Sequence, residues 1–93
     1  MTRPIPLSDE DVRLLTLAEY GYTYRPPDAL DGDVEALIGH LVELRERGLL
    51  RLEDGRIMKT QQGRYLMAGP CDLTVAGRRA LEHDRRLGPR GPA

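Results

Sequence analysis

Few side chains in this sequence are suited to catalysis, and they are not grouped as catalysis requires. His40 and His83 fall in separate expected helices, without cysteine or carboxylate partners at the spacing of a metal site, so both are expected on the surface. Ser8 is the only serine and is expected to cap a helix, which leaves a serine triad without a nucleophile. Cys71 lies in a Gly-Pro loop with no adjacent cation, which favours an inert thiol over the alternative, a redox sensor. We therefore expect no enzyme, no metal and no cofactor.

Cations and amides gather instead in one turn-rich segment, residues 53–64. Its cationic and amide side chains are Arg56, Lys59, Gln61, Gln62 and Arg64, and Arg51 lies just before the segment. Arginine and lysine contact phosphates, and amides hydrogen-bond to base edges, so this set suits backbone or minor-groove contact with DNA. The alternative is a solvated hairpin with ordinary surface charge.

A second set of candidate DNA contacts lies on an expected helix, residues 33–47. Helical spacing places five candidates opposite its apolar stripe: Glu35, Ala36, Gly39, His40 and Arg47. Glu35 can accept from a cytosine amine and His40 can donate to a guanine or a phosphate, although Glu35 and Glu43 would face the negative duplex. Gly39 costs about 1 kcal/mol relative to alanine in mid-helix. It indicates either a close approach of a phosphate or base, or an unselected surface glycine.

The sequence around this helix contains clear start and stop signals. The apolar residues recur at helical spacing: Val34, Leu37, Ile38, Leu41 and Leu44. Asp33 is the expected N-cap, and Gly48 is the expected left-handed residue after the last turn. An extended segment follows from Leu49, and Asp54-Gly55 predicts a hairpin turn.

The chain before this helix predicts an arm, a helix and an aromatic segment. Pro4 and Pro6 make residues 1–7 an extended arm. Ser8 and Asp11 form a capping box for a helix over residues 9–19.

Three alternating tyrosines follow: Tyr20, Tyr22 and Tyr24. Their spacing predicts one face of a short strand. They either line the small core or an interface, which we favour, or stack on bases. A short second helix is expected over residues 26–30, with a turn at Asp31-Gly32.

The chain after the hairpin predicts a strand, a loop and a last helix. Residues 61–63 give a second turn signal before a strand over residues 64–67, so we expect an enlarged hairpin or a third strand. Thr74 caps a helix that ends near Leu87, and residues 88–93 form a disordered tail. The arginines of this helix contact the DNA backbone, or the helix and the arm form a two-fold dimer interface.

These segments together resemble a known fold. The motif LxxLRERGLL, from Leu41 to Leu50, and the motif LTVAGRRAL, from Leu73 to Leu81, resemble bacterial winged helix-turn-helix transcriptional regulators of the MarR, PadR and ArsR kind. The resemblance covers roughly residues 8–87. It implies a mainly α domain with a small antiparallel β-sheet (α+β), three to four helices, an extended β-hairpin wing and a recognition helix over residues 33–47. It also implies a dimer that binds double-stranded DNA. Winged helices also serve as protein-docking modules, so docking of a partner on the acidic recognition helix is the alternative.

The charge distribution divides the chain into two halves. The net charge is −1, which argues against indiscriminate nucleic-acid binding. Residues 1–44 carry three arginines and nine acidic residues, a net of −6, whereas residues 45–93 carry eleven basic and six acidic residues, a net of +5. A polyanion should therefore meet the C-terminal half.

Composition and length indicate the number of domains, the type of genome and the location of the protein. Ninety-three residues suit one small domain. All but one of the fourteen basic residues are arginine, which we associate with a GC-rich bacterial or phage genome. The sequence has neither a signal-peptide pattern nor a membrane span, so we expect a cytoplasmic protein without membrane contact.

Overall fold

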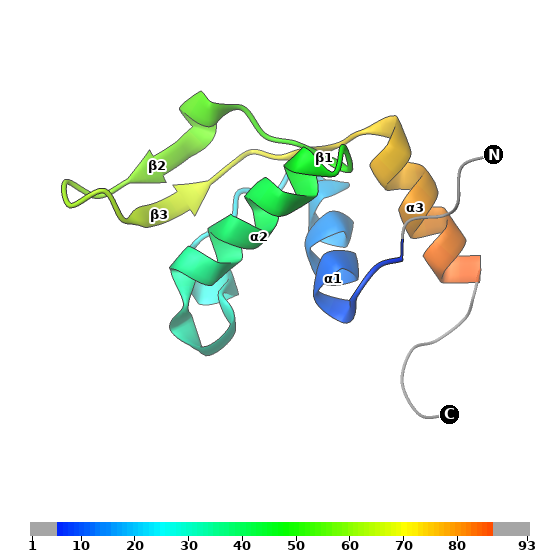
Figure 1. Ribbon diagram of the computed structural model, residues 1–93, viewed down its shortest axis with the longest axis horizontal. Coiled ribbons are helices and arrows are strands. Elements are labelled where there is room, and N and C mark those ends of the chain that lie inside the picture. Colours follow the sequence, from blue (N-terminus) through cyan, green and yellow to red (C-terminus); the bar gives the residue numbers. More distant parts are fainter. Residues whose placement is uncertain (1–5, 87–93) are drawn as a thin grey trace.

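The computed structural model describes residues 6–86 (Figure 1). In chain order the α-helices and β-strands are α1 (Asp9–Ala18), α2 (Val34–Glu46), β1 (Leu50–Arg51), β2 (Ile57–Lys59), β3 (Tyr65–Ala68), β4 (Asp72–Leu73) and α3 (Val75–Arg86). Three single-turn 3₁₀ segments connect them: η1 (Pro26–Asp28), η2 (Leu30–Gly32) and η3 (Asp54–Arg56). The chain is thus a small α+β fold, as the sequence predicts, with α1 and α2 in the middle and α3 and the β2–β3 hairpin at opposite ends.

Helix α1 begins at the expected capping box. The Ser8 hydroxyl accepts from the Asp11 N–H at 3.0 Å, and the Asp11 carboxylate accepts from the Ser8 N–H at 2.9 Å. Together they satisfy two backbone donors that the first helical turn leaves unpaired. Leu14, Leu15 and Ala18 then fall on one side of the helix and are buried in the core.

The tyrosine segment does not form the strand that alternation predicts. Tyr24 alone pairs with Ala68 in an isolated antiparallel bridge, and its ring is fully buried. Tyr22 packs edge-on against it, with ring centroids 5.1 Å apart. Tyr20 is 83% exposed, because the chain turns between it and Tyr22 at Gly21, which has a φ of +65°. The expectation that all three tyrosines share one face of a strand is therefore wrong, and Tyr20 does not line the core.

The short second helix is replaced by the single 3₁₀ turn η1. The helical conformation does not continue past Asp28, because Ala29 is extended, with a φ of −78° and a ψ of +133°, between η1 and η2. The chain then turns through Asp31 and Gly32, which have φ values of +54° and +72°, and this confirms the turn expected at this dipeptide.

Helix α2 has the expected boundaries. Asp33 caps it by accepting from the Ala36 N–H at 3.0 Å, and Gly48 ends it with a φ of +77°. Its buried residues are Leu37, Ile38, Leu41 and Leu44, four of the five that the helical spacing picks out; Val34 is half-buried.

The strands form two short antiparallel sheets from two segments of the chain. Residues 50–59 contribute β1 and β2, and residues 65–73 contribute β3 and β4. Strand β1 pairs with β4, and β2 pairs with β3. Between the sheets, the Gly69 N–H donates to the Arg56 carbonyl at 3.0 Å. The hairpin turn expected at Asp54-Gly55 is wrong, because these residues form η3 within the outgoing segment. The reversal lies at the second turn signal, residues 61–63, where Gly63 has a φ of +79°.

Helix α3 begins at Thr74, whose hydroxyl accepts from the Gly77 N–H at 2.9 Å and donates to the Gly48 carbonyl at 2.6 Å. Gly77 is buried against the chain that leaves α2, and a Cβ atom on it would lie 1.9 Å from the Leu49 carbonyl oxygen. The helix is described as far as Arg86. Its expected end at Leu87, the tail and most of the arm lie outside the described residues.

Candidate nucleic-acid interface

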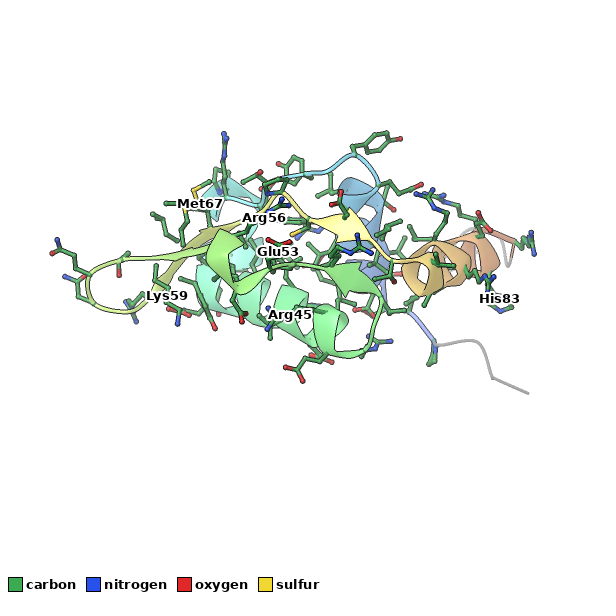
Figure 2. All side chains as sticks on the ribbon, turned by 90° about the horizontal axis from the view of Figure 1, so that it is seen from above. Arg45, Glu53, Arg56, Lys59, Met67 and His83 are labelled. Atoms are coloured by element: carbon green, nitrogen blue, oxygen red, sulfur yellow. The ribbon has the colours of Figure 1, made fainter. Side chains whose placement is uncertain are left out.

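The β2–β3 hairpin projects from the body and carries most of the predicted wing contacts on its tip (Figures 1 and 2). The Thr60 N–H donates to the Arg64 carbonyl at 2.8 Å, and the Gly63 N–H donates to the Thr60 carbonyl at 2.9 Å. These bonds fix a tight loop on which Gln61, Gln62 and Arg64 are all exposed. The tip therefore presents one cation and two amides to solvent.

Lys59 adds a second cation beside the tip. Its Nζ lies 5.2 Å from the centroid of the Tyr65 ring, directly across from it in the hairpin, so a cation–π contact orients the ammonium group. Figure 2 places Lys59 on the hairpin at the opposite end of the molecule from His83. Lys59, Gln61, Gln62 and Arg64 are hereafter called the tip set.

The other two wing arginines lie away from the tip set. Arg56 donates from Nη1 to the Pro70 carbonyl at 2.9 Å and lies 3.9 Å from the Glu53 carboxylate, so it bridges the gap between the two sheets. Arg51 lies further back, on β1, and is exposed. The six basic and amide residues of the predicted wing thus form a tip set of four, a bridging Arg56 and a separate Arg51.

Glu35 connects the hairpin to α2. Its Oε1 accepts from the backbone N–H of Tyr65 at 3.1 Å. This bond satisfies a donor on β3 and fixes the angle between the hairpin and the first turn of α2. The structure therefore gives the Glu35 carboxylate an internal partner in place of the cytosine amine that the sequence suggests.

His40 and Arg47 point toward α1, where both meet the Asp11 carboxylate. The His40 Nε2 pairs with Oδ1, and the Arg47 Nη1 donates to Oδ2 at 3.2 Å. Arg47 also donates from Nη2 to the Pro6 carbonyl at 3.0 Å. These side chains hold α2 and the start of the described chain onto α1, and they are not directed at the solvent side of α2.

Asp11 is the centre of this cluster and is only 5% exposed. Burial by itself raises the pKa of this carboxyl group, but hydrogen bonds from Ser8, His40 and Arg47 and the charge of Arg47 outweigh it, so the net pKa is lowered. The sequence assigns Asp11 only a capping role. The available signal is its position three and four residues before Leu14 and Leu15, which places it on the buried side of α1.

The solvent side of α2 is acidic. Ala36 and Gly39 are exposed, and so are Glu43 and Glu46 in the second half of the helix. A Cβ atom added to Gly39 would meet nothing within 4 Å, so no neighbour within the chain requires a glycine at this position. These four residues are hereafter called the acidic α2 face.

Two further arginines are held by carboxylates. Arg45 donates to the Leu52 carbonyl at 3.1 Å and to Asp54 at 2.7 Å. On α3, Arg85 pairs with Glu19 of α1, and this pairing lowers the pKa of the Glu19 carboxyl group. The remaining arginines of α3 are exposed: Arg78, Arg79 and Arg86.

Metal ligands, the thiol and membrane-spanning helices can each be assessed within the described residues. Within residues 6–86 there is no group of three or more histidine, cysteine, aspartate or glutamate side chains that could hold a metal ion. Cys71 is fully buried, and burial raises the pKa of its thiol to about 12, so it is protonated at neutral pH. No helix in the described part is long and apolar enough to cross a membrane.

Comparison of the chain with protein-family models, with curated proteins and with solved structures finds no match.

Proposed function

We propose that this protein binds double-stranded DNA through the tip set and acts as a small cytoplasmic transcriptional regulator with a winged helix-turn-helix arrangement. The observation that carries the proposal is the projecting β2–β3 hairpin, which presents Lys59, Arg64 and two glutamine amides at one end of the molecule. The order of elements supports it in part: α1, α2, a two-stranded hairpin and a last helix follow one another as the winged-helix resemblance implies, whereas the 3₁₀ turns η1 and η2 stand where it implies a second helix before α2.

The hairpin has the shape and charge for a DNA groove. Its two cations can each reach a phosphate, and the amides between them can bond to base edges or sugars. Lys59 is held over Tyr65 and therefore loses less side-chain entropy on binding than a free lysine does.

Helix α2 has a supporting role in this proposal. Its two candidate cationic contacts, His40 and Arg47, are engaged with Asp11, and its solvent side ends in Glu43 and Glu46. Carboxylates facing phosphates weaken binding. We therefore assign the main contacts to the hairpin rather than to α2 as a base-reading helix.

The test is a fluorescence-anisotropy titration of the purified protein against its own upstream DNA and against random duplexes, at several salt concentrations. The double variant Lys59→Ala/Arg64→Ala should weaken binding at least tenfold and should reduce the slope of log K against log salt by about 1.8, since each phosphate contact contributes about 0.9. The matched control is Arg79→Ala/Arg86→Ala, which removes the same charge from α3, and sedimentation of this variant checks that its oligomeric state is still that of the wild type.

Two results would contradict the proposal. If the wild-type protein binds no duplex even at low salt, where non-specific attraction is strongest, DNA is not its ligand. If both double variants lose the same affinity, overall charge rather than the hairpin drives the binding.

We also propose that the protein pairs through a two-fold axis, because regulators of palindromic sites are commonly dimers. The exposed side of α3, at the end of the molecule opposite the hairpin, is the proposed dimer surface. Sedimentation equilibrium should give twice the chain mass. A monomer at micromolar concentration contradicts this part of the proposal.

The acidic α2 face favours a second candidate function, docking of a basic partner protein. Glu43 and Glu46 are both exposed, which leaves a negative surface that DNA cannot use. Glu43→Lys/Glu46→Lys should abolish binding to such a partner, whereas it should leave DNA affinity unchanged or raise it. A crosslinking experiment with the wild-type and charge-reversed proteins separates the two functions.

A further inference from the structure

The hairpin carries an apolar patch next to its cations. Met58 is 51% exposed and Leu66 is 40% exposed, and Met67 beside them is half-buried. Within residues 6–86, the other large exposed apolar side chains lie singly on separate elements: Tyr20 after α1, Leu30 in η2 and Val75 in α3. Isolated surface apolar residues are normal, but neighbouring ones mark an interaction surface.

The strand register determines which face the patch occupies. Met58 and Met67 are directly opposite across β2 and β3, so their side chains share one face of the hairpin. Lys59 follows Met58 in the same strand and therefore points to the other face. Figure 2 agrees, because Lys59 and Met67 project to opposite sides of the hairpin. The register shifts between Met58 and Lys59, which leaves Leu66 as the extra residue of β3.

The hairpin thus carries Lys59 on one face, Met58 and Met67 on the other, and polar amides at its tip. A groove of DNA offers matching chemistry, since phosphates line its rims and the apolar edges of the sugars line its walls. A hairpin that enters the groove tip first brings both of its faces against the walls. Methionine suits such a contact because its flexible side chain adapts to an irregular surface.

We propose that Met58, Leu66 and Met67 pack against the sugar wall of the DNA groove that the tip set enters, so that part of the binding is apolar and independent of salt. This inference rests on the proposed function and adds to it a set of affinity-determining residues that are not charged. Apolar side chains in a groove also unstack and bend DNA in other minor-groove binders, which gives the contact a physical precedent.

The experiment compares two variants in the same anisotropy titration. Met58→Gln/Leu66→Gln keeps the size of both side chains and removes their apolar character at exposed positions. Binding should weaken roughly tenfold, as expected for losing the burial of one or two apolar side chains, while the salt slope stays that of the wild type. The control, Leu30→Gln, changes an exposed apolar residue that lies neither on the hairpin nor on α3, and it should bind as the wild type does. Thermal unfolding by circular dichroism confirms that all variants are folded.

Each other outcome overturns the inference in a distinguishable way. Unchanged affinity of the Met58→Gln/Leu66→Gln variant leaves DNA binding by the tip set intact and removes the apolar contact. If the variant also has a reduced salt slope, its loss of affinity comes from displacement of Lys59 and Arg64 rather than from the missing apolar contact. If DNA affinity is unchanged but the variant no longer binds vesicles with anionic lipids, the patch contacts a membrane surface. If DNA affinity is unchanged but the variant no longer forms a dimer in sedimentation, the patch contacts a second copy of the chain. No DNA binding by the wild type overturns the proposed function itself.

Discussion

At the scale of single residues, Asp11 connects more of the chain than any sequence pattern indicates. One nearly buried carboxylate receives hydrogen bonds from the Ser8 backbone, from His40 and from Arg47. Because a buried charge is stable only when it is paired, the carboxylate and its partners depend on one another. His40 and Arg47, which the sequence offers as contacts for DNA, instead hold α2 onto α1.

Removal of this charge should destabilise the fold. We expect Asp11→Asn to lower the free energy of unfolding by roughly 1–3 kcal/mol, a range that allows for the partial exposure of His40 and Arg47. Urea denaturation at pH 7 measures it. The control is Asp31→Asn, at an exposed position with a φ of +54°, which asparagine tolerates, so its stability should not change. Equal stability of the two variants would show that the Asp11 cluster contributes nothing.

The lowered pKa of Asp11 makes this contribution dependent on pH. A carboxyl group whose pKa is lower in the folded state stabilises the fold fully above its unfolded pKa, which is 3.8, and loses that effect as pH falls through its folded pKa. The difference in unfolding free energy between wild type and Asp11→Asn should therefore shrink as the pH falls below about 4. Urea titrations on both sides of this pH measure it, and a difference that grows toward low pH would contradict the assignment.

At the scale of elements, two helical glycines have opposite surroundings and should respond oppositely to alanine. A Cβ atom at Gly77 would lie 1.9 Å from the Leu49 carbonyl oxygen, so α3 must shift away from the backbone that follows α2. Gly77→Ala should cost about 1–3 kcal/mol in spite of the higher helix propensity of alanine. Thermal unfolding followed by circular dichroism measures this loss.

Gly39→Ala is the matched comparison, since nothing lies within 4 Å of the added atom. It should raise the free energy of unfolding by up to about 1 kcal/mol, the propensity difference in mid-helix. If the hairpin makes the main contacts, DNA affinity should be unchanged. A loss of affinity in a more stable variant would instead indicate a close approach of DNA at Gly39.

At the scale of the whole molecule, the two charged halves of the sequence are interleaved in space. The acidic α2 face lies between the cationic tip of the hairpin at one end and the exposed arginines of α3 at the other. A duplex can therefore reach the hairpin without lying along the whole protein, which limits the number of phosphates that it meets.

This arrangement predicts a shallow salt dependence. With Lys59, Arg64 and Arg51 as the available phosphate contacts of one protomer, the slope of log K against log salt should be about −2 to −3 for each protomer. Anisotropy titrations between about 50 and 200 mM salt would measure this slope. A slope steeper than about −6 per protomer would mean that α3 or α2 also lies on the duplex.

Sequence alone determined the starts of α1 and α2 and the end of α2, because these depend on local chemistry. The capping box at Ser8 and Asp11, the cap at Asp33 and the stop at Gly48 each act within a few residues, and the structure confirms all of them. The α+β class follows from the same local patterns.

Only the tertiary structure decided which strands pair and where the polar side chains point. Asp54-Gly55 and residues 61–63 are both good local turn signals, and the choice between them depends on the pairing of β1 with β4, more than twenty residues away. Likewise, helical spacing places His40 and Arg47 toward solvent, but the position of α1 brings the Asp11 carboxylate within reach of both. Such long-range contacts depend on how the elements pack, and no local pattern in the chain encodes them.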